Sequence, residues 1–434
     1  MNKLWRKLKN SLWLLPSIYS GIGLILAIIT VMFDTYFIKD YREFVPDILL
    51  TSVDLAIKIL ATLASALLTM TTFTFSIIMV VLTTYSSQFS PRALPNFMTE
   101  KTTMRVLGIF LGGFIYSIYS LLFMRKSIGN EYVISAAVGV LFTIVCLLFF
   151  IHFIHYIGKS IQVDYLIEKL TKETYECSQA LKKQLKGKRL AISNDFEIEL
   201  GFNKSCYCKE AAYLQMVNTE ELVSFATKNN LFIKFHHKIG EFVSEGKVVF
   251  TVYRDNGSVD DQLLETCKKH ITLAQQRNTS QDLSYSVQKL VEIALRATSP
   301  AINDPFTAKH CIRNIGKVLA EISPLLEGNL LFKDEEDKPR VFIAMESLQN
   351  LLYFSFYEFE VKSRKDLPIL GAILDALILT AQNSSVENRE VVWGFLDYIT
   401  YYFHEDMDLH ELDEEYLRVK KGMLFGVTHN EVST

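Results

Sequence analysis

The sequence predicts an α-helical membrane domain with four transmembrane helices, followed by a mixed α+β cytosolic domain that is mostly helical with a small β-module. Four long apolar runs lie between residues 12 and 157. From residue 158 onward, the pattern becomes that of an ordinary amphipathic protein, with short strand-like and longer helical segments. The length agrees with this division, because 434 residues exceed one typical domain and suit two or three units.

Four segments are long enough to span a bilayer as helices, at about 12–33, 55–84, 104–124 and 132–157. A spanning helix needs about 20 apolar residues, because every backbone polar group must find its partner inside the helix. The first run is too long for the core of a signal peptide, and no small-residue cleavage site follows it. Gly108 and Gly112 in the third run form a Gly-x-x-x-Gly pair, which is typical of closely packed membrane helices. We therefore expect a four-helix transmembrane domain over residues 1–160, surrounded by the lipid bilayer.

The charges that flank these runs predict the orientation of the chain. The 34–54 loop is rich in acids, whereas the N-terminus is basic through Lys3, Arg6, Lys7 and Lys9. Cytoplasmic segments of membrane proteins carry an excess of Lys and Arg. We expect a multi-pass protein of the cell (plasma) membrane with both the N- and C-termini in the cytoplasm. The net charge of −3 provides no global basic field, so no nucleic-acid partner is expected.

The second apolar run carries a stripe of hydroxyl side chains along one helical face. Steps of three, four or seven residues separate its members, which are Thr62, Ser65, Thr69, Thr72, Ser76 and Thr83. The same face reaches Lys58 at its outer end. The stripe either lines a water-filled path with Lys58 at its mouth or lets helices pack closely, and both interpretations stay open. A single helix cannot surround a pore, so a lining role needs an oligomer or other spans.

The rest of the chain is predicted to hold three parts. Residues 161–194 have the pattern of a connecting amphipathic helix, and residues 195–256 alternate strands and a helix in a small α+β module. A Gly-x-Phe-Val-x-x-Gly turn in this module resembles lipoyl or biotinyl carrier domains. The displayed lysine of such domains is missing, so we expect a structural role. Residues 257–434 are predicted to form a helical cytosolic domain with an acidic, solvated end.

A break in the helical pattern at residues 298–305 carries Pro300 and Pro305. Pro305 suits the first turn of a helix with Asn303 or Asp304 as its N-cap, which predicts a tight corner between two helices. The alternative interpretation is a cytosolic polar site for an ion or ligand, built from Gln281, Asp282, Arg296, Asn303 and Asp304.

No cofactor and no metal site are expected. Cys206 and Cys208 lack a second ligand pair at zinc-finger spacing, and the six cysteines form no CxxC pair. The chain holds no P-loop, GxSxG, HExxH or dinucleotide fingerprint, so we expect no enzyme. The apolar runs also hold no deep carboxylate, which argues against a proton pump.

Several strings of the sequence resemble one known family. Thr-Tyr-Ser-Ser-Gln-Phe-Ser-Pro-Arg stands at residues 84–92, and Ser-Pro-Ala-Ile-Asn-Asp-Pro stands at 299–305. From about residue 10 to at least 420, the chain resembles a bacterial family of predicted integral membrane proteins, domain of unknown function family 2254. One departure is Tyr156, where a second histidine is expected after His155. The resemblance implies a bacterial cell membrane and supplies no activity or catalytic residues.

Two functions follow as hypotheses. The first is a homo-oligomeric channel or transport protein with a cytosolic regulatory domain, based on the hydroxyl stripe and Lys58, which would mildly favour anions. The second is a membrane scaffold or sensor whose cytosolic domain binds a protein partner. Its basis is the β-module and the acidic helical end.

Overall fold

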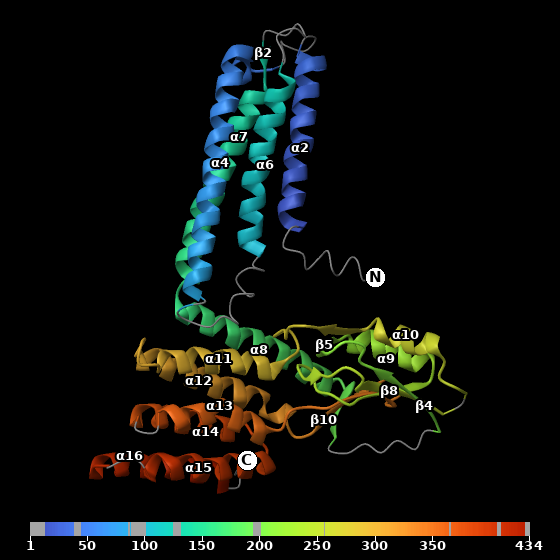
Figure 1. The fold of residues 1–434 in the computed structure, drawn as a ribbon, viewed down its shortest axis with the longest axis vertical. Coiled ribbons are helices and arrows are strands. Elements are labelled where there is room, and N and C mark those ends of the chain that lie inside the picture. The colour runs from blue at the N-terminus through green and yellow to red at the C-terminus, as the bar shows by residue number, and fades with distance from the viewer. Residues whose placement is uncertain are drawn as a thin grey trace. The chain divides into compact units, whose positions relative to one another are not determined.

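The chain folds into two compact units, divided between Gln162 and Val163. The computed structural model in Figure 1 describes residues 14–38, 45–85, 87, 101–124, 132–193, 201–255, 257–363, 366–405 and 409–429. Each unit is described by itself below.

The first unit holds four helices that are long and apolar enough to cross a membrane, as the sequence predicts. They are α2 (Leu14–Met32, extended by η1, Phe33–Phe37), α4 (Val53–Thr84), α6 (Lys101–Phe123) and α7 (Ser135–Ser160). At 1.5 Å per residue, α4 is about 48 Å long and so exceeds the ~30 Å hydrocarbon core of a bilayer. A short turn, η3 (Asp47–Leu49), precedes β1 (Thr51–Ser52), which pairs antiparallel with β2 (Tyr132–Val133).

Helices α2 and α6 pack so closely that their glycines cannot carry a side chain. A Cβ at Gly23 would lie 2.2 Å from the carbonyl oxygen of Gly112, and one at Gly112 would lie 2.6 Å from the carbonyl oxygen of Tyr19. A Cβ at Gly108 would lie 2.8 Å from the Cα of Pro16. The Gly-x-x-x-Gly pair is therefore a close-packing face, as predicted, and its partner is α2.

Asp34 ties the end of the first helix to the start of the fourth. Its carboxylate accepts hydrogen bonds from the backbone N–H groups of Ile134 at 2.8 Å and Ser135 at 3.2 Å, and from the Ser135 hydroxyl. The first N–H groups of a helix have no partner within the helix, and the helix dipole favours a negative charge beside them. Asp34 thus caps α7 from a distant part of the chain.

The second unit begins with α8 (Val163–Lys186) and contains two sheets. The six-stranded sheet has the order β3 (Leu190–Ser193), β10 (Asn329–Lys333), β11 (Pro339–Ile343), β6 (Leu231–Phe235), β8 (Val248–Arg254) and β4 (Phe202–Tyr207). The smaller sheet has the order β7 (Phe242–Val243), β5 (Ala212–Val217) and β9 (Ile271–Ala274). Only the β11–β6 pair of the larger sheet is parallel. Helices α9 (Thr219–Lys228) and α10 (Asp261–Lys268) complete this part.

The β-containing part is larger than the predicted module at 195–256. Strands β9, β10 and β11 lie within residues 257–434, where the sequence predicts only helix, and β10 and β11 occupy the middle of the larger sheet. Leu330, Phe332 and Val341 share one buried core with Ile233 and Phe250. A short apolar run in a sequence can be either a strand or a buried helix. The segments with which it pairs in the fold decide between the two. The strand predicted at 197–200 lies outside the described residues.

The remaining helices form a stack of roughly parallel rods at one side of the sheets (Figure 1). They are α11 (Leu283–Ala297), α12 (Pro305–Ile322, followed by η7, Ser323–Leu325), α13 (Leu348–Lys362), α14 (Leu367–Gln382), α15 (Val386–Glu405) and α16 (Glu411–His429). Gly316 of α12 permits a close approach, because a Cβ there would lie 2.6 Å from the Cα of Ala376 in α14. The mixed helical and β architecture predicted for the C-terminal part is confirmed.

Candidate functional site

The hydroxyl stripe lies on the outer face of α4. Its six hydroxyl residues and Lys58 are all exposed. The buried residues of α4 instead include Ala56, Leu60, Ala64, Leu67, Ile78 and Val81. At 100° per residue, the two sets fall on opposite sides of the helix. The stripe therefore does not pack against the other described helices of the first unit.

Five of the six stripe hydroxyls donate to carbonyl groups of their own helix. Thr62 donates to the carbonyl oxygen of Lys58 at 2.9 Å, Thr69 to that of Ser65 at 2.9 Å, and Ser76 to that of Thr72 at 3.0 Å. These hydroxyl protons thus have partners without any neighbouring helix. A hydroxyl oxygen also has acceptor lone pairs, so the face can still accept hydrogen bonds from water or a hydrated solute.

The outer faces of α2 and α7 differ from that of α4. They expose aliphatic side chains, such as Ile22, Ile25 and Ile29 on α2 and Leu141, Ile144 and Leu148 on α7. On α4, large apolar side chains instead flank the stripe, with Leu55, Phe73 and Val80 on one side and Ile57, Leu68 and Phe75 on the other. Aliphatic faces suit lipid contact, whereas α4 presents a polar line between two apolar ridges.

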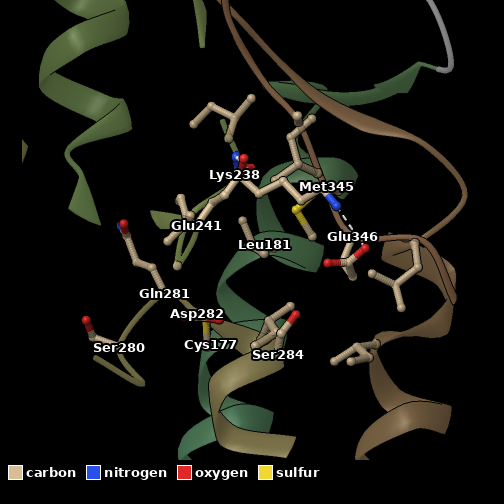
Figure 2. A pocket seen from close by; sticks show the side chains of 18 of the residues that line it. Cys177, Leu181, Lys238, Glu241, Ser280, Gln281, Asp282, Ser284, Met345 and Glu346 are labelled. Atoms are coloured by element: carbon tan, nitrogen blue, oxygen red, sulfur yellow. Dashed lines mark hydrogen bonds and ion pairs between the residues drawn. The ribbon is translucent and has the colours of Figure 1, made fainter. Parts of the chain in front are cut away.

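The second unit contains a cavity of about 380 Å³ between the β-containing part and the helices. Its walls come from α8, the start of α9, the β6–β7 loop, the start of α11, strands β10 and β11, and the start of α13. Figure 2 shows Lys238 and Glu346 meeting at one side, while Gln281, Asp282 and Ser284 lie along another.

Asp282 is the most buried acid of the cavity wall, with a 2% exposed side chain. The Arg277 guanidinium donates two hydrogen bonds to it, from Nε to Oδ2 at 2.7 Å and from Nη2 to Oδ1 at 2.9 Å. Asp282 also caps α11 by accepting from the Tyr285 N–H at 2.9 Å. Burial raises the pKa of the Asp282 carboxyl, whereas Arg277 and the Tyr285 N–H favour its charged form.

Two neighbouring contacts connect the start of α11 to the β-containing part. The Gln281 amide donates to the carbonyl oxygen of Val217 at 3.0 Å and accepts from the Val217 N–H at 2.9 Å, so it pairs with the end of β5. Gly240, in the β6–β7 loop, has φ of +89° and lies directly against Asp282. Only glycine adopts this conformation readily while leaving room for the carboxylate.

The predicted polar site is divided by the fold. Gln281 and Asp282 precede α11, whereas Asn303 and Asp304 follow it, and the 15 residues of α11 span about 22 Å. Asp304 caps α12 by accepting from the N–H of Thr307 at 3.1 Å, with Pro305 in the first turn. The predicted corner is therefore present, and its N-cap is Asp304.

The other two residues of the predicted polar site near this corner, Asn303 and Arg296, have structural roles. Asn303 has φ of +49°, a conformation that asparagine tolerates better than most residues, and its N–H bonds to the carbonyl oxygen of Ser299 at 2.8 Å. Arg296 lies in the last turn of α11, where a basic side chain suits the helix dipole. Neither residue contributes to the cavity wall, whereas Gln281 and Asp282 do.

Sequence reasoning missed the partners of Asp282. Arg277 and Gly240 lie five and 42 positions before it, and no short motif connects the three residues. Lys238 and Glu346, which form an ion pair at 2.8 Å at one side of the cavity, are 108 residues apart. The one available signal was Asp282 itself, since an acid three residues before a helical N–H is a typical N-cap.

A model of one protein family matches residues 9–378, which is most of the chain. The family is described as "Predicted membrane protein (DUF2254)". The chain belongs to this family. The match covers the four apolar helices of this DUF2254 protein and most of its second unit, and it ends within α14. The family resemblance seen in the sequence is thereby confirmed.

Curated relatives of this DUF2254 protein occur in mycobacteria. "Uncharacterized protein MT1328" of Mycobacterium tuberculosis is 24% identical over 399 residues, which cover 88% of this chain and 74% of the relative. "Uncharacterized protein Mb1321c" of Mycobacterium bovis is 23% identical over the same shares. No solved structure matches the chain significantly.

Five of the six cysteines of this DUF2254 protein are buried, and Cys177 is half-buried. Cys206, Cys208 and Cys267 belong to the core of the β-containing part. Burial raises the pKa of Cys267 to about 12, so its thiol stays protonated at neutral pH. Among the described residues, no three His, Cys, Asp or Glu side chains are grouped so that they could hold a metal ion.

Proposed function

We propose that this DUF2254 protein is a homo-oligomeric channel or transport protein in which the hydroxyl stripe of α4 faces a hydrated path between copies. The outward position of the stripe is the observation that carries the proposal. Polar residues of membrane helices usually face the interior of a bundle or a water-filled cavity. In one copy the stripe faces neither, so a second copy is needed to enclose it.

The apolar ridges beside the stripe support the same arrangement. When helices surround a path, each turns one face inward and packs against its neighbours through the two flanking faces. Phe73 and Phe75 stand on opposite flanks of the stripe and are both exposed in the single chain. They supply the large apolar side chains that contacts between neighbouring copies need.

The charge of the stripe favours anions. Lys58 is its only charged member, and it stands near the N-terminal end of α4, where the helix dipole adds positive potential. No carboxylate lies on the stripe between Lys58 and Thr83. Rings of basic side chains are typical of anion pathways.

A second surface suited to contact between copies lies on α16. Its exposed apolar residues repeat at steps of four, three and four positions: Leu412, Tyr416, Val419 and Met423. Acids gather at the start of α16, within residues 411–415, while Arg418, Lys420 and Lys421 follow around its middle. An antiparallel pair of α16 helices from two copies, centred on these apolar residues, would place the acidic start of each beside Lys420 and Lys421 of the other.

The alternative is a scaffold or sensor whose second unit binds another protein, and the same α16 face would be its docking surface. The two proposals differ in what covers this face. Crosslinking in cells followed by purification separates them: the channel proposal expects only further copies of this chain. A different protein recovered in stoichiometric amount would favour the scaffold.

Reconstitution of the purified full chain in planar bilayers tests the proposed path. We expect anion-selective conductance that falls at least tenfold when Thr69→Val and Thr72→Val are combined. The control combines Thr71→Val and Thr143→Val, which remove hydroxyls from half-buried positions off the stripe and should leave conductance unchanged. Absence of conductance from an intact oligomer in the unsubstituted protein would overturn the proposal.

A further inference from the structure

We infer that the cavity of the second unit is a binding site for an uncharged, largely apolar small molecule with hydrogen-bonding groups at one end. The inference concerns ligand binding by the second unit, and it stands whether or not α4 lines a path. The volume of about 380 Å³ lies within the usual range of small-molecule pockets, roughly 300–1,000 Å³.

One side of the cavity is apolar. Leu181 of α8, Leu330 and Phe332 of β10, Ile343 of β11 and Met345 after it contribute side chains to this wall. Contact with such a wall stabilises an apolar group by removing both surfaces from water. The methionine is unbranched and flexible, so it can adjust to the shape of a ligand.

The charged groups of the wall already have ion-pair or hydrogen-bond partners within the protein. Lys238 pairs with Glu346 at 2.8 Å, and Arg277 holds Asp282. The Glu241 carboxylate lies 2.7 Å from Nδ1 of His237, within hydrogen-bond distance, and also accepts from the Lys238 N–H at 3.0 Å. A ligand with a formal charge would have to break one of these pairs, because a partly buried charge without a counter-ion is costly.

Several neutral polar side chains of the wall, in contrast, have no hydrogen-bond partner among the described residues. Within the part of the chain that the structure describes, the side chains of Gln184, Thr219, Ser280 and Ser284 make no hydrogen bond to another residue, and all four line the cavity. They offer amide and hydroxyl donors and acceptors. These groups suit a ligand with a carbonyl, hydroxyl, amide or amine group and no net charge.

The polar side of the cavity is preformed. Gln281 binds the backbone of Val217, and Asp282 is fixed between Arg277 and Gly240. Ser280 and Ser284 flank this pair of residues in sequence. A ligand bound there would contact both α11 and the β6–β7 loop, and so would bridge the helical and β-containing parts of the unit.

Thiol labelling of the full chain tests the charge preference of the site. Ser284→Cys, in a Cys177→Ala background, is reacted with methyl methanethiosulfonate and with its trimethylammonioethyl and sulfonatoethyl counterparts. The control is Ser258→Cys at an exposed position. We compare the labelling rate of the neutral reagent with that of each charged reagent. We expect this ratio of rates to be at least tenfold higher at residue 284 than at residue 258. Equal ratios at the two positions would overturn the proposed chemistry.

A pair of aromatic probes tests binding itself. N-phenyl-1-naphthylamine is uncharged, whereas 1-anilinonaphthalene-8-sulfonate carries a negative charge on a similar frame. We expect the neutral probe to slow labelling of Ser284→Cys at least fivefold, with no effect at Ser258→Cys and little effect from the sulfonate. Ser280→Cys provides a second reporter if Ser284→Cys does not fold. Protection by both probes, or by neither, would contradict the inference, whereas conductance plays no part in the measurement.

Discussion

The carboxylate of Asp282 lies directly against the backbone of Gly240, so that a Cβ built on Gly240 would stand 1.9 Å from Oδ2 of Asp282. This contact joins the start of α11 to the β6–β7 loop, two segments that are 42 positions apart in the sequence. It also positions one side of the cavity. The contact depends on a residue that has no side chain and tolerates φ of +89°.

Gly240→Ala should therefore destabilise the second unit by at least about 2 kcal/mol, because positive φ and the clash with Asp282 add together. Gly246→Ala is the matched control, since Gly246 has φ of +76° but nothing within 4 Å of its Cβ position. Urea unfolding followed by tryptophan fluorescence measures both variants. Equal losses would mean that the clash is relieved and that only the backbone conformation matters.

Asp282→Asn should cost about 3 kcal/mol, because it leaves the Arg277 guanidinium without its counter-ion in a largely buried place. The asparagine can still cap α11, so the helix start itself should persist. Glu176→Gln is the control, since the Lys172–Glu176 pair is exposed and its charged atoms lie 3.9 Å apart. Unfolding midpoints in urea provide the comparison. A loss no larger than that of Glu176→Gln would contradict the importance of the pair.

The buried amine of Lys289 should make the free energy of unfolding depend on pH. It is buried in α11, and burial lowers its pKa to about 8 from 10.5. Between these values the unfolded chain binds more protons than the folded chain, so stability rises as pH increases through this window. We expect the contribution of Lys289 to rise by about 1–2 kcal/mol between pH 7.5 and 9.5. Lys289→Met should remove this rise when urea unfolding is repeated at both pH values.

Gly23→Ala should separate α2 from α6, because the new Cβ would stand 2.2 Å from the carbonyl oxygen of Gly112 and neither backbone can yield cheaply. Gly21→Ala lies on the same helix with nothing within 4 Å, so it should be neutral. Thermal aggregation of the purified protein in detergent reports the difference. A lower midpoint for Gly21→Ala than for Gly23→Ala would show that the two helices do not pack through this face.

Lys58→Glu tests the selectivity of the proposed path. Reversing the charge at the end of the hydroxyl stripe should shift the reversal potential in a salt gradient from anion toward cation preference. Lys159→Glu, which changes an exposed lysine of α7, should leave the reversal potential unchanged. A shift with both variants would indicate an effect of net charge and would place Lys58 away from the path.

The predictions that succeeded rest on local chemistry. Apolar runs of sufficient length identified the four long helices, and Pro305 behind Asp304 identified the corner at the start of α12. Each of these signals lies within a few turns of one segment, where backbone hydrogen bonding and helix capping act. The strands β10 and β11 pair with each other locally, but their other partners, β3 and β6, lie far away in the sequence, so their place inside a sheet could not be predicted from one segment.

For the candidate sites too, some features follow from the sequence of one segment and others only from how segments pack. The sequence by itself determined the hydroxyl stripe, because a fixed turn per residue places Thr62, Thr69 and Ser76 on one face of a helix. Only the tertiary structure decided that this face points away from the other described helices and that Gln281 and Asp282 belong to a cavity without Asn303. Helical periodicity is a property of one segment, whereas burial and the meeting of distant side chains depend on how segments pack.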